Sequence, residues 1–355
     1  MTETPLRQQS KTAGSPLKTM SEIARLAGVS ESTVSRALSG STLVAQKTRE
    51  RILKIAEAAN FSVNQQARNL ALGQTQTIEV IFPIEPGTLQ QVSDPFFVDM
   101  LAALTDELAK HQYDVLLTKS MPWDESRPGC AYLGGRADGV VFVGQGRHRA
   151  EIRDFARTHK HAVAWGAVNE ANDHCVVGSD NIGGGRLATE HLLSVGRRSI
   201  AFLGDRTLPE IAQRYDGYRQ ALAAAGLETD ESLAITAPFD IEEARRASEP
   251  LGDLYPAFDA IFAASDMIAL AAIAALRDRG IRAPEDVSIV GFDGIPAGAH
   301  VSPALTSIKQ DVRAGGRVLV KKIMDVLRFG DAQSEQLPVE LVVRQSCGAE
   351  QSLQA

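Results

Sequence analysis

The sequence predicts a protein of two parts, a small all-α module at the N-terminus and a larger α/β domain behind it. Residues 1–75 carry ten basic and five acidic side chains, a net charge of +5, whereas the remainder carries 27 and 39, a net charge of −12. Apolar residues recur at helical spacing in the first sixty residues. From residue 76 on, short apolar runs alternate with helical stretches, a pattern typical of parallel sheets covered on both faces.

Length and composition exclude several classes of protein. The chain has 355 residues, enough for two to three folded units, and its 44% hydrophobic and 23% charged residues are typical of a globular protein. The most apolar stretch, residues 260–276, is interrupted by Ser265 and Asp266, and the N-terminus has no apolar export core. Three scattered cysteines predict neither disulfides nor a zinc site. We therefore expect a cytoplasmic protein with no membrane partner.

The basic N-terminal part contains three predicted helices. Thr19 and Glu22 have the spacing of a capping box, and Gly28 suits the left-handed residue that ends a helix. Ser30 is placed to cap a second helix, and residues 46–60 repeat the apolar pattern of a third. Two short helices joined by a tight turn, the second exposing small polar and charged groups, predict a helix-turn-helix.

The stretch EIARLAGVSESTVSRAL (residues 22–38) closely resembles the headpiece of the LacI/GalR family of bacterial transcription regulators. The similarity continues through KTRERI (47–52) and NQQARNLALG (64–73). With the composition, it implies four segments along the chain: a disordered arm at 1–17, a helix-turn-helix domain at 18–62, a hinge helix or linker at 63–75, and an effector-binding and dimerisation domain at 76–355.

The resemblance assigns roles to polar residues of the headpiece. Residues that would read base edges in the major groove are Glu31, Ser32 and Arg36, because arginine can donate two hydrogen bonds to guanine and glutamate can accept one from cytosine. Residues that would hold phosphates are Ser30, Thr33, Ser35 and Thr48. Ala45 departs from the family, which usually has a capping serine ahead of the third helix. This loss should cost about 1 kcal/mol of headpiece stability.

The hinge segment, residues 64–73, is too short to form a stable helix alone, so composition alone indicates only a linker. The resemblance implies that it folds on operator DNA and pairs with its twin from a second subunit. Leu70 would insert between base steps of the minor groove. Ala67 would contact the partner hinge, and Asn64 and Arg68 would hold the backbone or the groove. Val63 replaces a proline that is common in the family.

The larger domain contains more strands than one compact sheet would hold. Strands are predicted at residues 78–82, 115–118, 139–143, 162–165, 199–203, 260–263, 288–291 and 341–343. Helices are predicted at residues 98–111, 184–195, 214–225, 267–278 and 312–329. The region resembles the two-lobed type I periplasmic-binding-protein architecture, which implies chain crossings near residues 178–181, 308–311 and 331–337. A ligand is then expected between the lobes, at the carboxyl ends of the strands.

Charged residues follow several predicted strands. Asp180, Asp205, Asp266 and Asp293 stand at such strand ends, and Arg214 is predicted to open a helix. Carboxylates and an arginine suit the vicinal hydroxyls of a sugar because charge-assisted hydrogen bonds are strong. Taken singly, each aspartate is better explained as a helix cap or a turn. The resemblance implies an effector site made of Asp94, Phe96, Phe97, Trp165, Arg214, Ser265, Asp266, Asp293 and Gln310.

Some of these positions have a second interpretation. Trp165 suits either stacking on a sugar or burial in the core, and Trp123 has a weaker claim to a ligand. Asp180 is better explained as the cap of a glycine-rich helix start, and Asp205 fits either role. The segment GQGRHR (144–149) matches the first half of a dinucleotide-binding fingerprint, but it lacks the third glycine and the following acid.

No nucleophile with a base and an orienting group can be identified, and the histidines form no cluster, so we predict no enzymatic activity, cofactor or metal. We expect a homodimeric, nucleoid-associated repressor of carbohydrate-use genes. A small sugar would release it from a pseudo-palindromic operator. The spacing GD…PEI…R (204–214) resembles that of proteobacterial regulators of glucoside use and suggests a glucose-containing disaccharide. Two alternatives stay open: a corepressor-type regulator that binds DNA better with effector, and a cytoplasmic sugar-binding protein.

Overall fold

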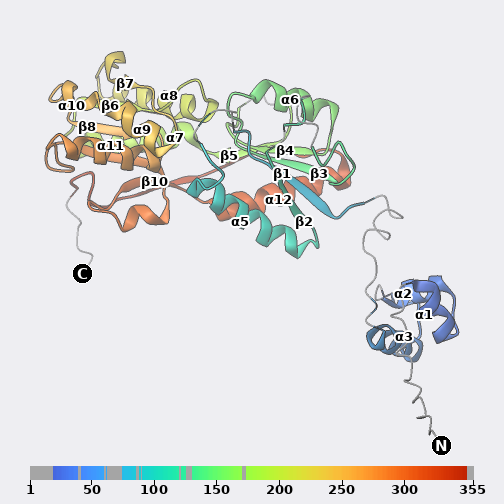
Figure 1. The fold of residues 1–355 in the computed structure, drawn as a ribbon. Helices are drawn as coiled ribbons and strands as arrows, with labels where there is room; N and C mark the ends of the chain where they lie inside the picture. The colour runs from blue at the N-terminus through green and yellow to red at the C-terminus, as the bar shows by residue number, and fades with distance from the viewer. Residues whose placement is uncertain are drawn as a thin grey trace, which may run out of the picture. The chain divides into compact units, whose positions relative to one another are not determined.

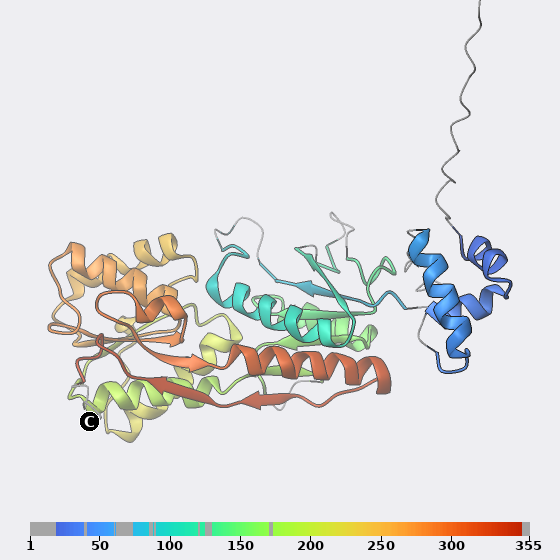
Figure 2. The ribbon, with the colours of Figure 1, turned by 90° about the horizontal axis from the view of Figure 1, so that it is seen from below.

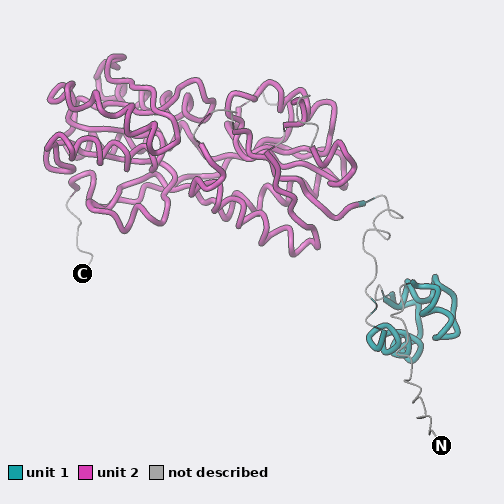
Figure 3. Tube along the Cα trace, in the orientation of Figure 1, with its two compact units in different colours: residues 1–74 teal, residues 75–355 magenta. Residues whose placement is uncertain are grey.

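The computed structural model describes residues 19–38, 41–59, 61, 74–84, 88, 90–119, 121–124, 130–169 and 173–349. It divides into two compact units, residues 1–74 and 75–355 (Figure 3). The predicted disordered arm and the hinge residues Asn64, Ala67, Arg68 and Leu70 lie outside the described residues. Among the described residues, no helix is both long and apolar enough to cross a bilayer.

The first unit is a three-helix domain. Its helices are α1 (Met20–Ala27), α2 (Glu31–Leu38) and α3 (Gln46–Ala58). The predicted capping box is confirmed: the Thr19 side chain accepts from the backbone of Glu22, and the Glu22 side chain accepts from the backbone of Thr19. Gly28 ends α1 with a left-handed φ of 63°. Three side chains with no exposed surface, Ile23, Val34 and Ile52, join the three helices in one small core.

Residues 75–355 contain two six-stranded sheets, which define lobe 1 and lobe 2 (Figure 1). The lobe 1 sheet has the order β11-β5-β4-β3-β1-β2, and all of its pairs are parallel. Its strands are β1 (Thr77–Ile81), β2 (Asp114–Thr118), β3 (Gly139–Val143), β4 (Ala162–Trp165), β5 (Val176–Ser179) and β11 (Glu335–Leu337). Helices α5 (Pro95–Lys110) and α12 (Val312–Phe329) pack together on one face, and α6 (Arg149–Thr158) packs on the other.

The lobe 2 sheet has the order β12-β10-β9-β8-β6-β7, and only β12 runs antiparallel, against β10. Its strands are β6 (Ile200–Leu203), β7 (Ala234–Ile235), β8 (Ala260–Ala263), β9 (Ser288–Asp293), β10 (Thr306–Gln310) and β12 (Val339–Val342). One face is covered by α7 (Asn181–Ser194) and α8 (Pro209–Ala224), and the other by α9 (Ile241–Ser248), α10 (Leu251–Leu254) and α11 (Asp266–Asp278). Single 3-10 turns lie at Glu231–Leu233 and Pro296–Ala299.

The chain passes between the lobes three times. It leaves lobe 1 at Asp180, between β5 and α7, and returns at Asp311, between β10 and α12. The last crossing is at Pro338, between β11 and β12, one residue beyond the predicted range 331–337. Figure 2 shows this last segment running beside α12 toward lobe 2, and an ion pair of 2.9 Å between Lys322 and Glu335 links α12 to β11.

Every strand and helix predicted from apolar runs is present, but several elements were missed. These are β5, β7, β10, β11, α6, α9 and α10. Strand β11 (EQL) lies at a sheet edge, and β10 (TSIKQ) is buried but polar, because Thr306 and Ser307 hydrogen-bond to Cys347 and Asp266. The prediction that Arg214 opens a helix was wrong. Pro209 occupies the first position of α8, so Arg214 lies in the second turn, where it faces the interior.

Ala45 is the N-cap of helix α3, so no side chain there accepts from the backbone N–H groups of the first turn. We expect Ala45→Ser to stabilise the headpiece by about 1 kcal/mol, because the new hydroxyl can accept from the backbone of the first turn. Amide hydrogen exchange in α3 should then slow about fivefold in the full-length protein. The control is Ala58→Ser, at the opposite end of α3. Equal protection in both variants would contradict a capping effect.

Candidate functional site

A cavity of about 380 Å³ lies between the lobes, at the carboxyl ends of strands from both sheets. Lobe 1 contributes residues that follow β1, β3 and β4 and residues at the start of α5. Lobe 2 contributes residues that follow β6, β9 and β10 and residues of α8. This is where a doubly wound architecture places a ligand, because the strand ends leave a crevice there.

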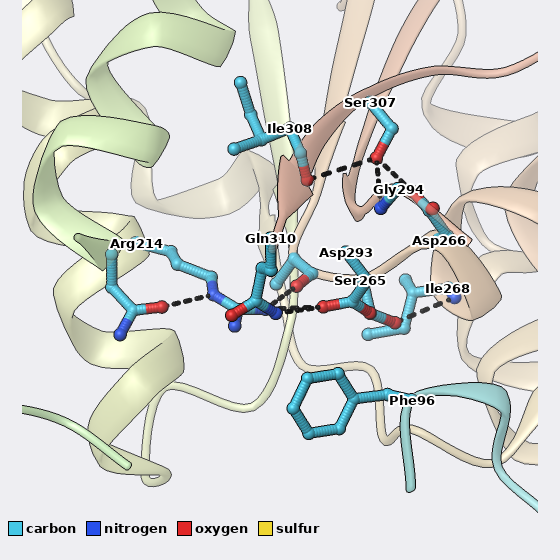
Figure 4. Close-up of polar contacts among 12 residues, drawn as sticks. Phe96, Arg214, Ser265, Asp266, Ile268, Asp293, Gly294, Ser307, Ile308 and Gln310 are labelled. Carbon is cyan, nitrogen blue, oxygen red and sulfur yellow. Dashed lines mark hydrogen bonds and ion pairs between the residues drawn. The ribbon is translucent and has the colours of Figure 1, made fainter. Parts of the chain in front are cut away.

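Arg214 projects from α8 into this cavity and is fixed on several sides (Figure 4). Its Nε donates to Asn181 Oδ1 at 2.9 Å, and its Nη1 donates to the backbone oxygen of Ala264. The guanidinium carbon lies 3.7 Å from the centre of the Phe292 ring, a cation–π contact. Asp293 Oδ1 is 3.8 Å from Nη1. The side chain is only 6% exposed, so its charge is held rigidly where a ligand would meet it.

Asp293 ends β9 in an unusual backbone conformation. Its φ is 116°, a region that residues other than glycine rarely adopt and that is maintained only where the surroundings enforce it. Gln310, at the end of β10, donates from Nε2 to Asp293 Oδ1 at 2.7 Å. Burial raises the pKa of the Asp293 carboxyl far above its usual value, although the positive charge of Arg214 opposes this effect. Arg214, Asp293 and Gln310 form one polar group on the lobe 2 side of the cavity.

Lobe 1 contributes the apolar side of the cavity. Phe96 and Phe97 stand at the start of α5, and Trp165 ends β4. The rings of Phe96 and Trp165 have centroids 6.1 Å apart, and Trp165 is 4% exposed. Asp94 caps α5 by accepting from the backbone of Phe96 at 2.9 Å, and burial raises its pKa. Aromatic rings opposite a few fixed polar groups are typical of small-molecule sites.

Most of the effector residues predicted from the sequence meet in this cavity, but two do not. Those that line it are Asp94, Phe96, Phe97, Trp165, Arg214, Asp293 and Gln310. Ser265 instead caps α11 by accepting from the backbone of Ile268 at 3.2 Å. Asp266 accepts from Ser307 Oγ (Figure 4). It also accepts from the backbone of Ile295, and burial raises its pKa to about 6. Both therefore hold the fold of lobe 2 beside the cavity.

Of the remaining candidates from the sequence, Asp205 lines the cavity, whereas Trp123 and Asp180 do not. Trp123 packs against Phe142 and His148 in lobe 1 and does not line the cavity. Asp180 caps α7 by accepting from the backbone of Gly183 at 2.8 Å. Asp205 does line the cavity. Burial raises its pKa, but hydrogen bonds from Thr207 and Arg147 outweigh this and lower the pKa below its usual value.

Several cavity residues were missed by the sequence reasoning. They are polar or charged side chains from both lobes, namely Thr88, Gln90, Gln145, Arg147, Glu210, Asp240 and Glu243. Gln145 and Arg147 belong to the segment GQGRHR, which was considered only as a nucleotide motif. Glu210 lies one turn before Arg214 on α8, a spacing that places both on one helix face. No group of three metal-ligating side chains meets within the described part of the chain.

The headpiece presents the predicted DNA-contacting residues on and beside α2. Glu31, Ser32, Ser35 and Arg36 are exposed there, and Thr33 and Thr48 are half-buried. The Ser30 hydroxyl, also exposed, lies 2.9 Å from those of Ser32 and Thr33. Small hydroxyl side chains therefore surround the one guanidinium and the one carboxylate of α2.

Comparison with known proteins gives the same picture. Residues 19–64 match the family model "Bacterial regulatory proteins, lacI family", and residues 189–347 match the model "Periplasmic binding protein-like domain". The HTH-type transcriptional regulator CelR of Thermobifida fusca is 32% identical, over 92% of this chain and 98% of its own.

Two solved structures are similar over almost their whole length. The transcriptional regulator CelR in complex with cellobiose is 30% identical, with a TM-score of 0.69, covering 93% of this chain and 100% of that one. The Lac repressor dimer bound to operator and the anti-inducer ONPF is 24% identical, with a TM-score of 0.78, covering 93% and 98%, and shows the shared fold. On the headpiece match and the 32% identity to CelR, the chain belongs to the LacI family of bacterial regulatory proteins.

Proposed function

We propose that this DNA-binding transcriptional regulator represses genes of carbohydrate use and is released from its operator by a glucose-containing disaccharide. The observation that carries this proposal is the polar group of Arg214, Asp293 and Gln310 opposite the rings of Phe96 and Trp165. Charged groups can hold adjacent hydroxyls, and aromatic rings can cover the less polar faces of a sugar. The cavity, at about 380 Å³, falls within the range of about 300–1,000 Å³ that is usual for small-molecule sites.

The similarity to CelR supports a disaccharide in particular. The CelR structure is a complex with cellobiose, and it covers 93% of this chain at 30% identity. In this chain Leu208, Phe239 and Glu243 also line the cavity, so its lining is larger than one polar group. A second sugar ring would contact these residues.

The headpiece is proposed to read the operator through α2. Arg36 suits guanine and Glu31 suits cytosine, with Ser32 beside them. The groups proposed to hold phosphates are the hydroxyls of Ser30, Thr33, Ser35 and Thr48. The proposed hinge contacts to the minor groove and the partner hinge are Asn64, Ala67, Arg68 and Leu70.

The proposed switch joins the two sites through lobe geometry in a homodimer. A sugar that bridges the lobes would favour one angle between them, and this angle would set whether the two hinges can pair on DNA. Coupling between two such sites is typically 1–3 kcal/mol, or about 5–150-fold in affinity. A change of this size is enough to move an operator from mostly bound to mostly free.

Operator titrations test the proposal directly. Fluorescence anisotropy would follow the protein on a pseudo-palindromic duplex from its own promoter, with cellobiose, maltose and trehalose added in turn. We expect one sugar to weaken binding about 5–150-fold. Strengthened binding would indicate the corepressor alternative. DNA binding depends steeply on salt, so the titration is repeated at several salt concentrations. If the protein binds a sugar but binds the duplex at none of them, the alternative of a sugar-binding protein is supported.

Arg36→Ala should cost about 1–3 kcal/mol of operator binding and relax discrimination at one base position, because a bidentate contact to guanine would be lost. The measurement is affinity for the operator and for its single-base variants. The control is Arg25→Ala, which removes an exposed arginine from α1. If Arg36→Ala lowers affinity for every sequence alike, Arg36 contacts phosphate only.

Arg214→Ala should abolish the response to sugar, so that the variant stays on the operator when sugar is added. Removing the guanidinium leaves Asp293 buried without its partner, but the raised pKa lets this carboxyl become neutral, which limits the cost to folding. Arg214→Lys should also lose the response to sugar, because an ammonium group cannot place several N–H donors in one plane as a guanidinium does. A normal sugar response in either variant would remove Arg214 from the site.

Sugar affinity should rise with pH. Burial raises the pKa of Asp293, so at low pH the carboxyl is protonated and has lost acceptor capacity; as pH rises through this pKa, the carboxylate forms and accepts from sugar hydroxyls. Asp94 and Glu210 also line the cavity with pKa values raised by burial. Asp293→Asn should therefore flatten most of the pH dependence measured by calorimetry between about pH 5 and 9. If the slope of sugar affinity against pH stays unchanged in this variant, a group other than Asp293 titrates.

A further inference from the structure

The segment between β3 and α6, residues 144–147, forms a turn that only glycines allow; we name it the GQGR loop. Gly144 and Gly146 both have left-handed φ values, 88° and 51°. The backbone N–H of Gly144 donates to Trp165 O at 3.0 Å, and a Cβ on Gly146 would lie 3.1 Å from Pro83 O. The glycine spacing that resembled half of a nucleotide fingerprint therefore has a conformational cause.

The turn places Gln145 in the lining of the cavity. Gln145 is completely buried, and its Oε1 accepts from the backbone N–H of Ala167 at 3.2 Å. Because that N–H can only donate, the amide oxygen must face Ala167, and the amide nitrogen must face the other way. Gly166 makes room for this arrangement, since a Cβ there would lie 2.5 Å from Gln145 Cγ.

The amide nitrogen of Gln145 is left without an acceptor. Its Nε2 is buried and has no hydrogen-bond partner among the residues that the structure describes, and Gln145 lines the cavity. Leaving such a donor unpaired costs about 1–3 kcal/mol, so its position favours an acceptor oxygen in the cavity. A hydroxyl or ring oxygen of a sugar would meet this need.

An ion pair joins the same loop to the opposite lobe. Arg147 Nη2 donates to Asp205 Oδ2 at 3.0 Å, while Asp205 Oδ1 is occupied by the backbone and hydroxyl of Thr207. The Asp205 side chain is 11% exposed and the Arg147 side chain 61%, so only the carboxylate of this ion pair is shielded from water. Asp205 belongs to lobe 2, so this contact exists only when the cleft is closed at this point.

We propose that the GQGR loop senses the effector: the Gln145 amide donates to an oxygen of the bound sugar, and the Arg147–Asp205 ion pair holds the loop against lobe 2 so that this contact and cleft closure occur together. This inference rests on the proposed function, in which the cleft takes a sugar. It assigns Gln145 as a specificity-determining residue and Arg147 and Asp205 as positioning residues.

The charges around the loop further restrict the ligand. Acidic side chains in the cavity lining outnumber arginines; the acids are Asp94, Asp205, Glu210, Asp240, Glu243 and Asp293, and the arginines are Arg147 and Arg214. Arg147 is already paired with Asp205, and Arg214 already donates to Asn181 and to the backbone of Ala264. A phosphorylated sugar would meet no uncommitted arginine in this lining, so the loop favours a neutral ligand.

The first test uses Gln145→Glu, which keeps an oxygen for Ala167 and replaces the donor by an acceptor. The probe is whichever of cellobiose, maltose or trehalose binds the wild type, together with its monodeoxy derivatives. We expect at least a tenfold loss of affinity in calorimetry, measured on variant protein whose circular dichroism spectrum shows that it is folded. One monodeoxy sugar should bind the wild type more weakly but lose little further in Gln145→Glu. Equal affinity of wild type and variant for the parent sugar would overturn the role of Gln145, as would independent losses for every deoxy position.

The second test needs no ligand, so it separates the loop from the sugar assignment. Spin labels at Glu151→Cys on α6 and Gln220→Cys on α8 would report the distance between lobes, since both positions are exposed and the native cysteines are buried. Arg147→Met and Asp205→Asn should each shift the distance distribution to longer values, and the double variant should shift it no further. The control is Arg153→Met, whose exposed arginine pairs with Asp154 in its own lobe.

The outcomes of the two tests are distinguishable. If no sugar binds the wild type, the proposed effector class is wrong, and the distance measurement alone decides the role of the ion pair. If the distances in Asp205→Asn equal those of the wild type, the ion pair does not hold the cleft and the inference fails, whatever sugar binds. Tighter binding of glucose 6-phosphate than of glucose would contradict the preference for a neutral ligand.

Discussion

The guanidinium of Arg214 is the group around which the cleft is organised, because a nearly buried cation must be surrounded by partners. Its partners come from the ends of separate elements: Asn181 at the start of α7, Ala264 after β8, and Asp293 at the end of β9. The guanidinium also lies over the ring of Phe292 in a cation–π contact. One side chain thus fixes the relative positions of the strand ends in lobe 2 and leaves their polar atoms at the cavity surface.

Three short crossings connect lobe 2 to lobe 1, and they determine how the lobes can move. The first two crossings lie at helix N-caps, where Asp180 accepts from Gly183 and Asp311 accepts from Ala314. These caps tie each crossing to the helix that follows it, so a change of angle between the lobes is confined to few residues. Contacts across the cleft, such as Arg147 with Asp205 and Gln213 with the backbone of Val168, then determine which angle is preferred.

The sequence predicted those features whose causes are local. The capping box of Thr19 and the turn at Gly28 depend on neighbours within three residues, and the buried strand β3 is a continuous apolar run. Asp266 and Asp293 look alike in the sequence, since each follows a buried strand. They differ because Ser307 and the backbone of Ile295 engage Asp266, whereas Asp293 faces the cavity. The role of Gln145 depends on Gly166 and Ala167, neighbours twenty residues away, which no local pattern reveals.

The separation of charge between the two parts of the chain limits how a ligand could switch DNA binding. The first 75 residues carry a net charge of +5 and the remainder −12, so phosphates are attracted to the headpiece and repelled by the acidic body. A neutral sugar adds no charge to the cleft, so its binding would leave the long-range attraction between headpiece and DNA almost unchanged. The coupling would then have to pass through lobe geometry. Operator affinity should accordingly keep most of its dependence on salt when sugar binds, and lose only the part that comes from hinge contacts such as Arg68.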